Sequence, residues 1–100
     1  MEMNVTKIVF NGCFGCFGLS EAGFKRYAEL GGIAENLYQL DSNRADPILA
    51  QVVEELGKKA NTRFSDLMIR ELPAGTKYRI DEYDGNEAVV TIDEYDWSVA

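Results

Sequence analysis

Residues 5–10 form a run rich in β-branched and aromatic side chains, a pattern that predicts a β-strand. The same pattern recurs at residues 37–40, 67–72, 77–82 and 88–93, so five strands are predicted in all. Pro73 and Gly75 separate the third predicted strand from the fourth and indicate a turn.

A first helix is predicted to begin after the glycine-rich stretch that follows the first strand. Ser20 is a favourable N-cap, and Leu19 and Phe24 have the spacing of a hydrophobic staple. Phe24 also shares a face with Tyr27 and Ala28. The pair Gly31-Gly32 predicts the end of this helix.

A second helix is predicted from its cap and its apolar stripe. Asp46 stands at the N-cap and Pro47 at the first helical position, where a missing N–H is tolerated. The predicted buried stripe consists of Leu49, Val52, Val53, Leu56 and Ala60. On the opposite side, residues 54 and 58, and likewise 55 and 59, are spaced as i,i+4 ion pairs of glutamate with lysine.

The last two predicted strands are joined by Tyr83-Asp84-Gly85, which we interpret as a three-residue hairpin loop with Gly85 in the left-handed conformation. The resulting register places five apolar side chains on one face of the hairpin. These are Tyr78, Ile80, Ala88, Val90 and Ile92.

The element order β-α-β-α-β-β-β predicts one globular domain over residues 1–100. Its fold class is α+β (an α/β two-layer arrangement), with a mixed sheet of about five strands packed against two helices. We expect the first β-α-β unit to be a right-handed crossover between parallel strands.

The net charge of −7 is concentrated at one end of the chain. Residues 71–100 carry eight acidic and two basic side chains, whereas residues 1–70 carry nine acidic and eight basic. Because lysine and arginine are nowhere clustered, direct binding to nucleic acid is not expected. No apolar run approaches a membrane span, the start lacks the pattern of a secretory signal, and two cysteines make no disulfide framework. A cytoplasmic location is therefore predicted.

The stretch between the first strand and the first helix is the strongest candidate for a ligand site. Glycines let a ligand approach the backbone, free N–H groups ahead of a helix favour an anion, and phenylalanine rings can stack on a base. The candidate ligand-binding residues are Asn11, Gly12, Phe14, Gly15, Phe17, Gly18 and Ser20. The spacing matches neither a dinucleotide fingerprint nor a triphosphate loop, so a plain strand-to-helix connection with both phenylalanines buried is the alternative.

Cys13 and Cys16 form a C-x-x-C sequence after a strand, which also fits a glutaredoxin-like thiol oxidoreductase. Against that interpretation, the predicted helix begins four residues after Cys16, too far for its dipole to activate Cys13 strongly. The chain has no histidine, so Ser-His-Asp and Cys-His mechanisms are excluded and no metal or cofactor is expected.

The hairpin itself is acidic, with Asp81, Glu82, Asp84 and Glu87 close together in sequence. Their spacing is not that of a calcium loop. They predict either a solvated rim or a surface that meets a basic partner, together with the C-terminal segment that contains Tyr95 and Trp97. A homo-oligomer is left open, with Trp97 as an apolar anchor.

Three segments together resemble one family of short, uncharacterised phage and prophage proteins. They are the loop that carries Asn11, Cys13 and Phe14 and ends in Leu19-Ser20, the Asp46-Pro47 helix, and the hairpin Glu82-Tyr-Asp-Gly-x-Glu87. Cys16 stands where a second glycine is typical, so the resemblance implies no essential role for that cysteine. It implies a phage-encoded protein in a host cytoplasm and brings no established activity.

The sequence therefore predicts a small non-enzymatic binding protein that sequesters an anionic, nucleotide-like ligand or host defence signal at the glycine-rich loop. The first alternative is an inhibitor of a host protein that acts through the acidic hairpin. The second is a thiol oxidoreductase that uses Cys13 and Cys16.

Overall fold

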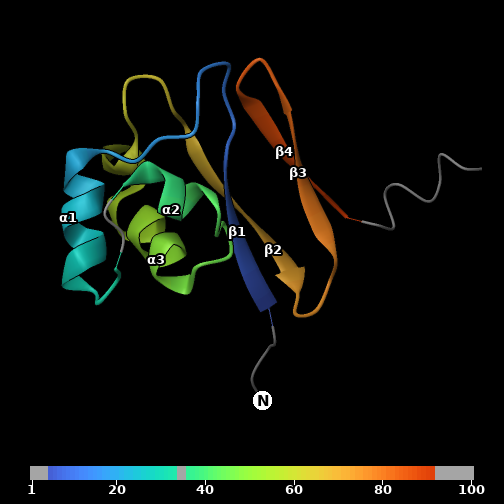
Figure 1. Ribbon diagram of the computed structural model, residues 1–100, viewed down its shortest axis with the longest axis horizontal. Coiled ribbons are helices and arrows are strands. Elements are labelled where there is room, and N and C mark those ends of the chain that lie inside the picture. The colour runs from blue at the N-terminus through green and yellow to red at the C-terminus, as the bar shows by residue number, and fades with distance from the viewer. Residues whose placement is uncertain (1–4, 34–35, 92–100) are drawn as a thin grey trace, which may run out of the picture.

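The structure is a computed structural model that describes residues 5–33 and 36–91. Figure 1 shows helices gathered at one end of the molecule and strands at the other. The elements in chain order are β1 (Val5–Asn11), α1 (Glu21–Glu29), α2 (Leu37–Asp41), α3 (Pro47–Leu56), a 3₁₀ turn (Gly57–Ala60), β2 (Leu67–Pro73), β3 (Tyr78–Tyr83) and β4 (Asn86–Thr91).

The described strands form two separate antiparallel pairs, β1 with β2 and β3 with β4. An α+β fold is confirmed, but the single mixed sheet of about five strands is wrong. The outer edge of β1 shows why β4 does not extend the first pair. There the amide of Val9 donates to the carbonyl of Arg44 at 2.9 Å, and the amide of Asn11 donates to the carboxylate of Glu87 at 2.7 Å.

The predicted second strand, residues 37–40, is instead the short helix α2. Leu40 of this helix is 1% exposed and packs in the main core. A short apolar run of this kind fits either a strand or a buried helical turn, and packing decides between them. Because this segment is helical, the predicted parallel β-α-β crossover is also wrong.

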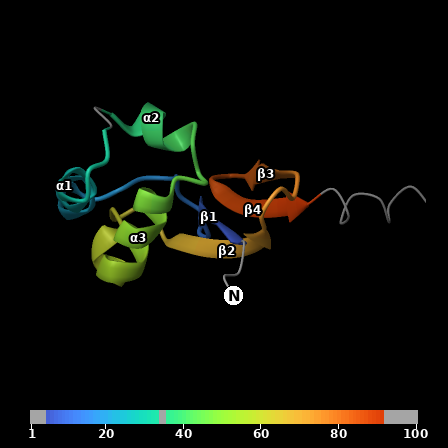
Figure 2. The same cartoon turned by 90° about the horizontal axis from the view of Figure 1, so that it is seen from below.

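Both faces of the β1–β2 pair are covered, which explains the continuous apolar run in β1. Val9 and Ile69 face the helices, whereas Ile8 and Leu72 pack against Val89 of the hairpin. Figure 2 shows the β3–β4 hairpin lying over the β1–β2 pair. The alternation of side chains along a strand thus divides the apolar residues between two clusters.

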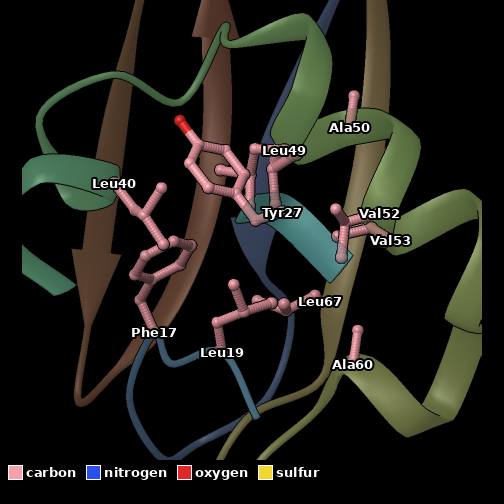
Figure 3. Close-up of a cluster of buried hydrophobic side chains, with 11 residues drawn as sticks. Phe17, Leu19, Tyr27, Leu40, Leu49, Ala50, Val52, Val53, Ala60 and Leu67 are labelled. Carbon is pink, nitrogen blue, oxygen red and sulfur yellow. The ribbon is translucent and has the colours of Figure 1, made fainter. Parts of the chain in front are cut away.

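The main core lies between the helices and the β1–β2 pair (Figure 3). The stripe predicted for the second helix is confirmed at four positions, with Leu56 half-buried. The buried members of this cluster are Val9, Phe17, Leu19, Tyr27, Leu40, Leu49, Ala50, Val52, Val53, Ala60 and Leu67.

The predicted helix caps are also confirmed. Ser20 accepts a hydrogen bond from the amide of Gly23 at 3.0 Å, and Asp46 accepts one from the amide of Ile48 at 2.9 Å. The phenol of Tyr27 donates to the other carboxylate oxygen of Asp46, so the two helices are joined at the cap of α3.

α3 is shorter than predicted, because Gly57 has a positive φ of 57° and the chain continues as a 3₁₀ turn. The predicted ion pairs of Glu54 and Glu55 with lysines four residues later are therefore wrong. Glu54 instead binds Lys7 at 2.6 Å, and Glu55 binds Arg26 at 2.7 Å. Both contacts reach across elements and not along the helix.

The hairpin turn has two residues where three were predicted. Asp84 and Gly85 both have positive φ, 52° and 86°, as a type I′ turn requires. β4 is consequently shifted by one residue, so Val89 faces inward beside Ile80 while Ala88 is exposed. A shift of one residue reverses every side chain of a strand, so the predicted inward positions in β4 are wrong. Predicted Ile92 lies outside the described residues.

None of the helices in residues 5–33 and 36–91 has the length and apolar character that a membrane span requires.

Candidate functional site

Asn11, at the end of β1, is fully buried and connects three segments that are distant in sequence. Its side-chain amide donates to the carbonyls of Cys13 at 3.0 Å and Gly85 at 2.8 Å. Its side-chain oxygen accepts from the amide of Asp66 at 2.7 Å. One buried side chain therefore holds the glycine-rich loop, the hairpin turn and the start of β2 together.

The hairpin turn contacts the glycine-rich loop without any intervening side chain. A Cβ atom on Gly85 would lie 1.6 Å from the carbonyl oxygen of Gly15, and a Cβ on Gly15 would lie 2.0 Å from the carbonyl oxygen of Phe64. Only glycine permits these approaches between backbones. The loop and the turn thus form a single surface.

Arg44 is the charged centre of this surface and is only 7% exposed. Its guanidinium binds both carboxylate oxygens of Glu87, at 2.7 and 3.0 Å, and also pairs with Asp41. The same guanidinium lies over the ring of Phe17, with its carbon 3.6 Å from the ring centroid. This is a bidentate ion pair combined with a cation–π contact.

Burial acts to lower the pKa of Arg44, but the hydrogen bonds that it donates to Glu87 and then Asp41 outweigh burial and raise the pKa above its ordinary value. The guanidinium is therefore always charged, and its charge is balanced within the protein. Glu87 is constrained in turn, because it also accepts the hydrogen bond from the amide of Asn11. Arg44 therefore does not act as a proton donor to a substrate at neutral pH.

A cleft of about 590 Å³ opens beside Arg44, between the hairpin, α2 and the glycine-rich loop. Four carboxylates and one guanidinium lie among its walls. Glu82 and Glu87 are directly opposite each other across the hairpin, an arrangement of like charges that is unfavourable by itself. The lining residues are Gly15, Cys16, Phe17, Asp41, Arg44, Ile80, Glu82, Asp84, Gly85 and Glu87.

The structure places the predicted ligand-binding residues in different environments, and only some of them line the cleft. Gly15 and Phe17 line the cleft, whereas the ring of Phe14 is 68% exposed to solvent. Asn11 acts behind the cleft as a structural connection. Ser20 is fully engaged, because its hydroxyl caps α1 and donates to the carbonyl of Lys59 at 2.7 Å.

Three of the loop amides predicted to receive an anion are bonded within the protein. Gly12 donates to the carbonyl of Asp66 at 2.8 Å, Gly15 donates to Cys13 at 2.9 Å, and Cys16 donates to Phe64 at 2.9 Å. Gly18 is buried beside Thr62, and its carbonyl accepts a hydrogen bond from Ser65 at 3.0 Å. These bonds fix the loop's shape and engage three of the amides that were predicted to bind an anion.

Cys13 and Cys16 are both free thiols. Cys13 donates weakly to the side-chain oxygen of Asn11 at 3.4 Å, and Cys16 lies exposed at the wall of the cleft. α1 begins only at Glu21, so neither thiol lies at a helix N-terminus. The parallel strands of a glutaredoxin-like domain do not occur among the described strand pairs.

Sequence reasoning missed Asp41 and Arg44, the two charged residues that α2 and the segment after it bring to the cleft. Both lie where the chain has no regular apolar period, and the strand predicted for residues 37–40 would have placed them elsewhere. Glu82 and Glu87 were identifiable as the ends of the hairpin motif, although their shared face depends on the two-residue turn.

Among residues 5–33 and 36–91, no group of three or more acidic, cysteine or histidine side chains could hold a metal ion. Comparisons of the chain with protein-family models, with curated proteins and with solved structures each found no match. The resemblance to short phage proteins therefore stays a prediction.

Proposed function

We propose that this protein is a non-catalytic binding module whose cleft receives a cationic group of a partner protein. The observation that carries the proposal is the cleft's charge, four carboxylates around one guanidinium. That guanidinium is already paired with Glu87 and Asp41. Glu82 and Asp84 thus remain as exposed negative charges at the entrance.

Coulomb energies favour a cation over an anion in this cleft. Two unit charges 4 Å apart near a protein surface interact by about 4 kcal/mol before desolvation is subtracted. A guanidinium or ammonium group would be attracted by the exposed carboxylates of Glu82 and Asp84, whereas a phosphate would be repelled by them. In the phage setting that the loop and hairpin motifs imply, the partner would be a basic surface of a host protein.

Binding of the nucleotide-like ligand predicted from the loop remains the alternative, and this geometry favours it less than binding of a cation. Three of the amides that would hold its phosphate, those of Gly12, Gly15 and Cys16, donate to protein carbonyls, and the Ser20 hydroxyl donates to the carbonyl of Lys59. Phe17, one of the two rings predicted to stack on a base, is 7% exposed and covered by Arg44. A base would have to displace that contact.

The proposal is tested by titrating the protein with capped arginine and, separately, with ATP, while recording amide chemical shifts. Capped arginine should shift the amides of Gly15 and Gly85 at millimolar concentration, because a single ion pair near solvent is weak. Glu82→Gln should weaken this binding about threefold or more. Asp81→Asn is the matched control, since it removes the same charge from the opposite face of β3.

Shifts caused by ATP and not by arginine would favour the loop as an anion site and refute the cationic proposal. Equal weakening by Glu82→Gln and Asp81→Asn would show that only net charge matters and that the cleft is not the site.

A further inference from the structure

Two exposed aromatic side chains stand together beside the acidic cleft. The ring of Phe14 is 68% exposed and that of Tyr83 is 77% exposed. Their centroids are 6.4 Å apart and the planes are inclined at 81°, an edge-to-face pair. We call Phe14 and Tyr83 the aromatic pair.

The aromatic pair is held in place by the buried contacts beneath it. Phe14 precedes Gly15, and Tyr83 is two residues before Gly85, so the backbone contact of these glycines sets the distance between the rings. Asn11 reinforces the contact through its hydrogen bond to the carbonyl of Gly85. The rings therefore form a preorganised apolar surface that loses little conformational entropy when it is covered.

Neither ring of the aromatic pair lines the acidic cleft, but the backbone neighbours of both residues do. Gly15, next to Phe14, lines the cleft, and so do Glu82 and Asp84 on either side of Tyr83. Aromatic residues are enriched at the cores of protein interfaces, and tyrosine is enriched among the residues that dominate binding energy. A ligand that fits both features carries a positive charge and an apolar group within a few ångströms of each other.

We propose that the aromatic pair is the apolar anchor of the binding site, and that the partner presents a basic residue flanked in sequence by apolar side chains. This inference rests on the cationic role of the cleft proposed above. The basic residue would enter the cleft while a neighbouring apolar side chain covers Phe14 and Tyr83. A small organic cation would leave the pair uncovered, so the site selects a protein segment.

The negative charge of the site favours a basic protein segment over a second copy of this chain or a membrane surface. A second copy of the chain would bring its own net charge of −7 and its own carboxylates against Glu82 and Asp84. An anionic membrane surface would be repelled for the same reason. A basic partner segment is complementary to the rim and the pair together.

The test compares two capped pentapeptides with a central arginine, one flanked by leucines and the other by glycines, by isothermal titration of the full-length protein. We expect the leucine-flanked peptide to bind about tenfold more tightly, because it covers apolar surface in addition to making the ion pair. Phe14→Ala and Tyr83→Ala should each remove most of this advantage and leave the glycine-flanked peptide unaffected. Both side chains are exposed, so thermal melting should show that the variants remain folded.

Ile33→Ala is the matched control, because Ile33 is 90% exposed and follows α1, the helix that Figure 1 shows at the end of the molecule away from the β3–β4 hairpin. This variant should bind both peptides as the wild type does. Equal affinity for the two peptides, with binding retained in Phe14→Ala, would overturn the aromatic anchor while the cationic cleft still stands. Failure of both peptides to bind would overturn the cleft itself.

Sedimentation equilibrium tests the remaining candidate partner, a second copy of this chain. The wild type and Phe14→Ala should have the same molecular mass. A dimer in the wild type that becomes monomeric in Phe14→Ala would show that the aromatic pair joins two copies of this chain, which contradicts the proposal.

Discussion

Arg44, Glu87 and Asn11 show how single buried polar residues determine where the hairpin sits. Arg44 and Glu87 are each about nine-tenths buried or more, and their bidentate pair joins the segment after α2 to the hairpin. Breaking such a pair costs more than its net contribution, because the remaining charge is left in a poorly solvated place. The polar contacts at the cleft are therefore also structural.

Glu87→Gln tests this. Without the carboxylate charge, Arg44 retains Asp41 as its only carboxylate partner, and we expect the free energy of unfolding to fall by about 2 to 3 kcal/mol. Urea denaturation measures the change. Glu82→Gln is the control on the opposite strand, where the exposed side chain keeps an oxygen that can accept the hydrogen bond from the Gly85 amide, so stability should be nearly unchanged. Equal losses in the two variants would contradict a special role for the buried pair.

Tyr27 gives a prediction at alkaline pH. Burial, followed by the hydrogen bond to Asp46, raises the pKa of Tyr27 to about 12 from 10.0. The unfolded chain then ionises first, so this contribution to stability is complete below pH 10 and is lost as the pH rises toward 12. This pH-dependent contribution of Tyr27 to the free energy of unfolding is on the order of 2 kcal/mol.

Tyr27→Phe should therefore be less stable than the wild type at pH 8 by about 1 kcal/mol, the value of one buried hydrogen bond. By about pH 11 the difference should vanish, because the wild type alone loses the Tyr27 contribution as the unfolded phenol ionises. Urea unfolding of the wild type and of Tyr27→Phe at pH 8 and at about pH 11 measures this difference in the free energy of unfolding. A constant difference across this range would show that the phenol of Tyr27 titrates normally.

At the scale of the elements, the hairpin is positioned by a contact between two backbones. Both Gly75 and Gly85 have positive φ, 88° and 86°, but open space surrounds Gly75 whereas Gly85 meets the carbonyl of Gly15. The two turns therefore make the same demand on conformation and differ only in packing.

Gly75→Ala should cost about 1 kcal/mol of unfolding free energy, the strain of a left-handed alanine. Gly85→Ala should cost at least about 2 kcal/mol more, because the added methyl group forces the hairpin away from the loop. Thermal unfolding measures both, and chemical shifts of the amides near Asn11 report on the displacement. Similar losses of unfolding free energy in Gly75→Ala and Gly85→Ala would mean that the contact of Gly85 with Gly15 contributes little to stability.

At the scale of the whole molecule, charge and apolar surface make separable contributions to binding. The net charge of −7 strengthens attraction of a basic partner at low ionic strength, and salt screens it over about 10 Å at 0.1 M. Apolar contact with Phe14 and Tyr83 is not screened in this way.

Raising the salt concentration from 0.02 to 0.5 M should therefore weaken both arginine pentapeptides several-fold. The ratio of their affinities should stay near tenfold, because the leucine contribution is independent of charge. Isothermal titration across this salt series gives both quantities. A ratio that falls to one at high salt would assign the preference to electrostatics and not to the aromatic pair.

Local chemistry in the sequence determined the caps of α1 and α3, the buried stripe of α3, the strands β1 and β2, and the acidic character of the hairpin. Each depends on residues within a turn or two of one another, such as Ser20 with Gly23 or Asp46 with Ile48. The negative charge of the candidate site was equally visible, although the ligand first predicted from the loop was an anion.

Only the tertiary structure decided which partner each strand pairs with, that residues 37–40 are helical, and that β4 turns Val89 inward. It also decided that Arg44 is buried between Glu87 and Phe17, and that Phe14 meets Tyr83. The physical reason is that these contacts join residues far apart in the sequence, 43 positions for Arg44 with Glu87 and 74 positions for Asn11 with Gly85. Local propensity does not rank such alternatives, whereas burial of charge and close packing of backbones do.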